Sequence, residues 1–148
     1  MSGNAFAVVF TLAAGAAAAV QVAINAALGR RIGTLEAAMF QTAVGVAVFA
    51  VMMLVSRQSL AGVGNAFREP AWLWLGGVMG AVIIVAITYA PQRIGTFATA
   101  GLLIALQLVA TAAIDHFGLF GLDRIGFTWE RAIGFALLAG GAALALRH

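Results

Sequence analysis

Five long apolar segments, interrupted by arginine, glycine and proline, constrain this chain more than any other feature. They cover residues 4–28, 34–55, 71–90, 96–114 and 128–146. Each is close to the roughly 20 residues that an α-helix needs to cross a hydrocarbon layer about 30 Å thick. They do not alternate polar and apolar side chains, as the strands of a membrane barrel do. Because backbone polar groups in lipid must bond within their own segment, we expect five transmembrane helices.

The composition leaves little room for a water-soluble surface. Of 148 residues, 64% are hydrophobic and 9% are charged, whereas about a quarter of a soluble domain is charged. The eight cations are scattered arginines that form no basic run, which argues against a nucleic-acid partner. The sequence therefore predicts an all-α integral membrane protein, with residues 1–148 forming a single five-helix domain surrounded by the lipid bilayer.

No catalytic arrangement is visible in the chain. It has no cysteine and only two histidines, which leaves no ligand set of the kind that holds zinc. Its serines, Ser2, Ser56 and Ser59, do not lie deep in any apolar segment. The sequence also has no glycine-rich phosphate loop and no carboxylate pair at catalytic spacing. We therefore expect no enzyme, no cofactor and no metal site.

The arginines divide evenly between the two sides of a membrane crossed five times. One side has Arg57, Arg68, Arg124 and Arg131, and the other has Arg30, Arg31, Arg93 and Arg147. Because an excess of arginine usually sets orientation, this balance predicts insertion in both orientations and pairing of inverted copies. The alternative is a single orientation set by the first hairpin, with Arg30 and Arg31 in the cytoplasm.

Polar side chains inside the apolar segments are the candidates for a binding site. Gln21 and Asn25 share one helix face because they are four residues apart. Gln107 lies near the middle of its segment, and Tyr89 lies at the end of the third. Such groups are costly in lipid unless they meet a partner or a wet cavity. They predict either a solute cavity between the first, third and fourth helices or hydrogen bonds between helices.

Two carboxylates near the ends of segments are candidates for a gate or for a counter-charge to a cationic solute. Glu36 stands in the first turn of the second segment, where the helix dipole also favours an anion. Asp115 ends the fourth segment, where an ordinary solvated charge is the alternative interpretation. We expect Thr88, Thr96 and Thr111 to bond carbonyls of their own helices instead of a solute.

Several motifs in order resemble a known family. They are Gln21-x3-Asn25-x2-Leu28-Gly29, Gln41-x3-Gly45, the tryptophan- and glycine-rich run at residues 72–80, Gly95-Thr96, Gln107-Leu108 and the run at residues 115–121. Together they resemble the half-size YdcZ-like inner-membrane family of the drug/metabolite transporter superfamily. The resemblance implies a multi-pass inner-membrane protein of five helices, equal to half of a ten-helix exporter. It also implies a cavity formed mainly by helices one, three and four.

The resemblance implies an exporter of small organic solutes or metabolites that works by alternating access. Its partner is expected to be an inverted copy of itself or a paralogous short chain of opposite orientation. Gln21, Asn25, Gln107 and Tyr89 are the predicted solute-binding residues, with Glu36 and Asp115 near the mouths. The alternatives are a small ion channel and a non-transporting subunit that packs against a larger membrane protein.

Overall fold

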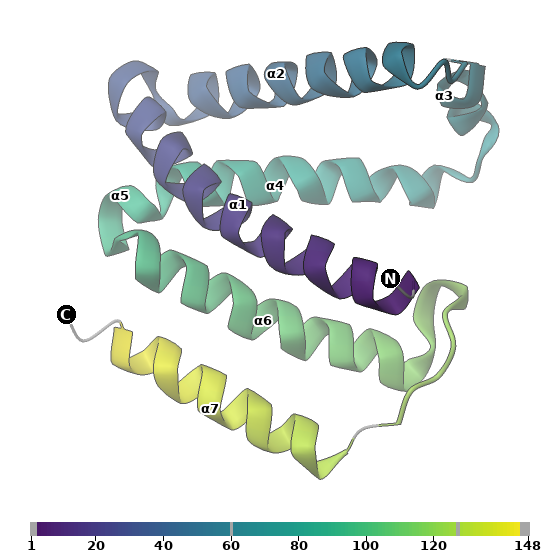
Figure 1. Cartoon of the computed structure of the whole chain (residues 1–148). Coiled ribbons are helices and arrows are strands. Elements are labelled where there is room, and N and C mark those ends of the chain that lie inside the picture. The colour runs from purple at the N-terminus through teal and green to yellow at the C-terminus, as the bar shows by residue number, and fades with distance from the viewer. Residues whose placement is uncertain (1–2, 60, 127, 146–148) are drawn as a thin grey trace. The chain divides into compact units, whose positions relative to one another are not determined.

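The computed structural model describes residues 3–59, 61–126 and 128–145, which form helices and connections without a strand (Figure 1). The long helices are α1 (Gly3–Ile32), α2 (Thr34–Val55), α4 (Leu75–Tyr89), α6 (Thr96–Phe117) and α7 (Trp129–Ala145). The short elements are α3 (Ala61–Asn65), α5 (Pro91–Ile94) and the 3₁₀ turns η1 (Ala66–Arg68), η2 (Ala71–Trp74) and η3 (Leu119–Gly121). This architecture confirms the all-α part of the predicted fold class.

Four helical segments in the described part of the chain are long and apolar enough to cross a membrane. They are Gly3–Ile32, Thr34–Val55, Ala71–Ile94 and Thr96–Phe117. The fifth predicted segment forms α7, which has 17 residues and so extends about 25 Å. Four spans are therefore supported by length and composition, and the fifth stays a prediction.

The chain divides into two compact units, residues 1–92 and 93–148. In the first unit α1 packs on α2 and α4, and α2 also packs on α4. In the second unit α6 packs on α7. That all five helices form one domain stays a prediction.

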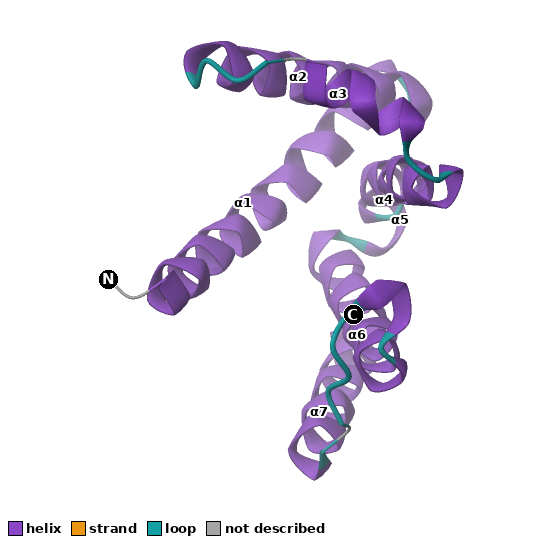
Figure 2. Ribbon diagram, turned by 90° about the vertical axis from the view of Figure 1, so that its right-hand side faces the viewer, coloured by secondary structure: helices purple, strands orange, loops and turns teal. Residues whose placement is uncertain are grey.

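The core of the first unit lies where α1 ends, α2 begins and α4 ends. Its buried residues are Val22, Asn25, Ala26, Gly29, Ala37, Ala38, Ile87, Thr88 and Pro91. Toward its N-terminus α1 diverges from α2 and α4 (Figures 1 and 2), and residues 3–21 are all exposed. This unit is therefore tightly packed at one end only.

A repeated tetrapeptide marks two of the helix connections. Arg-Ile-Gly-Thr occurs at residues 31–34 and again at residues 93–96. Its glycines have φ 101° and ψ 153° at Gly33 and φ 80° and ψ 161° at Gly95. This backbone region is essentially restricted to glycine. Each glycine carbonyl then accepts a hydrogen bond from the backbone of the following helix, from Ala37 N–H at 3.1 Å and from Thr99 N–H at 3.2 Å.

Candidate solute-binding site

Asn25 lies on the buried face of α1, between Val22 and Gly29. Its exposed fraction is 0%, and neither Oδ1 nor Nδ2 of its amide has a hydrogen-bond partner. A buried polar group without a partner costs about 1–3 kcal/mol. The amide therefore destabilises this packing unless another molecule or another conformation supplies the missing hydrogen bonds.

One turn after Asn25, α1 comes very close to α4. A Cβ added at Gly29 would lie 2.7 Å from Thr88 Cγ2 and 2.7 Å from Gln92 Nε2, so any larger residue would require these side chains or the helices to shift. Thr88 is itself fully buried, and its hydroxyl donates to the carbonyl of Ile84 at 2.7 Å. Gln92 Nε2 donates to the Thr88 carbonyl at 2.6 Å, which ties α5 to the end of α4.

The other predicted residues of the first unit are accessible. Gln21, one turn before Asn25, is exposed, and so is Glu36 in the first turn of α2. Tyr89 follows the buried Thr88 and is 50% exposed. Of the predicted residues in this unit, Asn25 alone lies inside the packed end.

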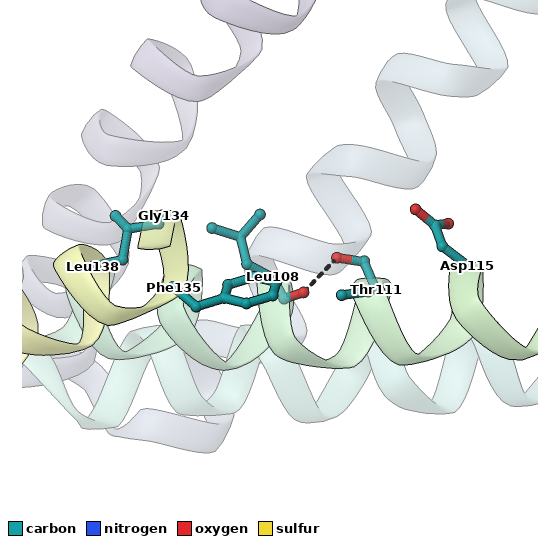
Figure 3. Close-up of a pocket in the computed structure, with 7 residues that line it drawn as sticks. Leu108, Thr111, Asp115, Gly134, Phe135 and Leu138 are labelled. Atoms are coloured by element: carbon teal, nitrogen blue, oxygen red, sulfur yellow. Dashed lines mark hydrogen bonds between the residues drawn. The ribbon is translucent and has the colours of Figure 1, made fainter. Parts of the chain in front are cut away.

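The second unit contains a pocket of about 330 Å³ between α6 and α7. Its polar residues are Thr111 and Asp115 of α6, and its apolar wall includes Phe135 and Leu138 of α7 (Figure 3). Asp115 is half-buried. The structure therefore places the predicted Asp115 in a mainly apolar pocket, which the sequence analysis did not foresee.

Gln107 is exposed and does not line this pocket, although it lies one turn before Thr111. Its backbone carbonyl accepts a hydrogen bond from the Thr111 hydroxyl at 2.9 Å. This contact does not involve the side-chain amide of Gln107. The predicted cavity would join Gln107 to Gln21 and Asn25, which belong to the other unit. That shared cavity stays a prediction.

Two of the three threonines expected to bond carbonyls of their own helices, Thr88 and Thr111, do so. Thr88 donates to the carbonyl of Ile84. Thr111 donates to the carbonyl of Gln107 and to that of Leu108, the bond drawn in Figure 3. These bonds satisfy the hydroxyls within their own helices. The contrast with the amide of Asn25, which has no such partner, singles out Asn25 among the polar residues of the spans.

A sequence model of a known protein family identifies the family to which this chain belongs. The sequence model of the family described as "Putative inner membrane exporter, YdcZ" matches residues 6–144. The chain belongs to the YdcZ family. No curated protein and no solved structure matches it. This YdcZ protein is thus a multi-pass protein of the inner membrane and a membrane transporter.

Three residues of this YdcZ chain were missed as parts of the packed end around Asn25. The sequence places Gly29 in a family motif and predicts a bond from Thr88 within its own helix, and it gives no role to Gln92. The spacing of Asn25 and Gly29, four residues apart, could have placed both on one face. The contact with Thr88 and Gln92 joins distant parts of the chain, which helix periodicity does not reveal.

Proposed function

We propose that this YdcZ protein exports small organic solutes by alternating access, as an antiparallel pair of five-helix units. In this pair α7 serves as the fifth span. The even division of arginines, four on each side, supports insertion in both orientations. The second unit of the pair is an inverted copy of this chain or a paralogous short chain of opposite orientation.

The observation that carries the transport proposal is the buried amide of Asn25. A residue that only holds helices together should have its hydrogen bonds made, as Thr88 and Thr111 do. Asn25 has none and is 0% exposed. A transporter has a reason to keep such a group, because the solute provides the partner in one step of the cycle.

The remaining polar residues have supporting roles in this proposal. Gln21, Gln107 and Tyr89 are accessible, so they can meet the solute together with Asn25 once two units form a cavity. Glu36 and Asp115 lie near opposite ends of their spans. In an antiparallel pair each mouth would therefore have one carboxylate from each copy.

Flux through proteoliposomes tests the proposal directly. The Gln107→Leu variant should lose most of its solute flux while keeping the thermal stability of the wild type, because an exposed amide adds little to packing. Gln58→Leu, outside the spans, is the matched control and should transport normally. Unchanged flux in Gln107→Leu would remove this residue from the solute pathway.

The same preparation separates the exporter from its rivals. Flux far above roughly 10³ solutes per second per dimer would indicate a channel, because typical turnover values lie below that range. A purified dimer that no solute stabilises against heat, and that carries none, would instead indicate an assembly subunit.

A further inference from the structure

We propose that Asn25 is the subsite for an uncharged, amide-like group of the solute, and that the contact of Gly29 with Thr88 and Gln92 closes this subsite. The inference rests on the proposed function, since it names the class of solute and the position of one gate.

The chemistry of the amide selects the class of solute. Asn25 presents an acceptor, Oδ1, beside a donor, Nδ2, and both lack partners. A single planar group with a donor next to an acceptor satisfies both at once, as a carboxamide, a urea or a nucleobase edge does. A carboxylate would satisfy Nδ2 alone, and an ammonium group would satisfy Oδ1 alone.

The lack of charge among the described buried residues also favours an uncharged solute. Within the described ranges, the buried polar residues are Asn25, Thr88 and Thr99, and none of them is charged. Glu36, the carboxylate of the first unit that lies closest in sequence to Asn25, is exposed. Burying an ion without a counter-charge is far more costly than burying a neutral group that forms hydrogen bonds. A neutral solute therefore fits this site better than an ionic one.

The position of the gate follows from the close approach of α1 and α4. On one side of Asn25, Gly29 meets Thr88 and Gln92 so closely that a single added Cβ would not fit. On the other side, one turn earlier, Gln21 is exposed. Separation of α1 from α4 at Gly29 would uncover the amide toward the end of the unit where α1 joins α2. The structure thus corresponds to a state in which this gate is closed.

Thermal stability distinguishes an orphaned amide from a structural one. Replacing an unpartnered buried amide with an apolar side chain of similar shape should be stabilising. Asn25→Leu should therefore raise the Tm of the purified protein by about 2–4 °C. The control is Thr99→Val, because Thr99 is also buried but its hydroxyl donates to the Gly95 carbonyl at 2.7 Å. Its Tm should stay equal or fall.

Paired probes test the class of solute with shape held nearly constant. Urea should stabilise and cross with the wild-type protein, whereas guanidinium should not, and nicotinamide should be carried in preference to nicotinate. Asn25→Leu should reduce the flux of both neutral probes by roughly tenfold or more, because the hydrogen bonds to the site are lost.

The gate can be followed with a thiol label, since the chain contains no cysteine. An Asn25→Cys variant should react slowly with a membrane-permeant maleimide, and adding Gly29→Ala should accelerate the reaction because the new Cβ forces α1 from Thr88. Gln58→Cys, which is exposed and lies outside the spans, is the control and should react quickly with or without Gly29→Ala.

The outcomes separate the inference from the proposed function. A lower Tm in Asn25→Leu, or equally fast labelling at positions 25 and 58, would overturn the inference. Flux of guanidinium or nicotinate without their neutral counterparts would also overturn it, yet would leave the exporter standing. Failure to carry any solute, these four included, would overturn both.

Discussion

Residues 31–34 and residues 93–96 have the same sequence and the same backbone but different surroundings. Gly33 and Gly95 both have positive φ with extended ψ, and each precedes a 22-residue helix. At Gly33 an added Cβ would overlap the carboxylate of Glu36, whereas at Gly95 it would meet open space. The shared tetrapeptide fixes the position of the helix break, whereas a side chain of the next helix lies over the glycine at Gly33 but not at Gly95.

The chain before each turn differs as well. α1 continues through Arg30 and Arg31 to the first turn. Before the second turn, Pro91 begins the short α5, because the fixed φ of proline suits the first position of a helix. The first turn connects helices of one unit, while the second follows the boundary at Gln92 between the two units.

The largest expected effect comes from forcing a side chain onto the two glycines. Gly33→Ala and Gly95→Ala should each lower the free energy of unfolding by about 1–3 kcal/mol, because alanine does not adopt this φ and ψ without strain. Gly33→Ala should cost at most slightly more, since the Glu36 carboxylate that its Cβ overlaps is the end of a flexible, exposed side chain. Denaturation of the purified protein in detergent measures both values.

Two further variants sharpen this result. Gly76→Ala is the control, because an added Cβ there meets nothing within 4 Å inside α4, and it should be neutral or stabilising by up to about 1 kcal/mol. Adding Glu36→Ala to Gly33→Ala should reduce the loss in free energy of unfolding to that of Gly95→Ala. Equal costs for the two glycines from the start would mean that Glu36 moves aside freely.

A smaller effect is expected from the arginines that open the two turns. Arg31→Gln and Arg93→Gln each leave three arginines on one side against four on the other. At about 1 kcal/mol per arginine near an anionic membrane surface, the ratio of orientations should change roughly fivefold. Reporter fusions at the C-terminus that respond on opposite sides of the membrane measure this ratio.

Equal shifts from the two substitutions would support orientation by total charge balance. A strong shift from Arg31→Gln with none from Arg93→Gln would instead favour a single orientation set by the first hairpin. One clean orientation in the unmodified chain would contradict dual topology outright.

The long helices could be predicted from the sequence because hydropathy and glycine breaks decide them locally. The segment 34–55 agrees with α2 at both ends. α1 runs to Ile32 instead of ending near residue 28, since arginine is a good helix former and a helix need not stop at the lipid boundary. The third segment begins with the turn η2 before α4 starts at Leu75.

The sequence predicts which polar residues share a helix face, but not which of them is buried. Gln21 and Asn25 share a helix face by spacing, yet Gln21 is exposed and Asn25 is fully buried. The difference arises because α1 meets α4 only at the end that contains Gly29, and helix spacing does not encode that divergence. The repeated Arg-Ile-Gly-Thr tetrapeptide, by contrast, is visible in the sequence itself and indicates both turns that require glycine.

The smallest expected effect concerns the charge that only the first turn has. Glu36 lies in the first turn of α2, whereas α6 has no acidic residue there. An exposed anion near a helix N-terminus stabilises by about 0.3–1 kcal/mol at low salt. Glu36→Gln should therefore lower the free energy of unfolding by no more than this amount, and the loss should shrink as salt screens the interaction. A loss above this range that salt does not change would show that Glu36 holds α2 by direct packing on Gly33 instead of through the dipole.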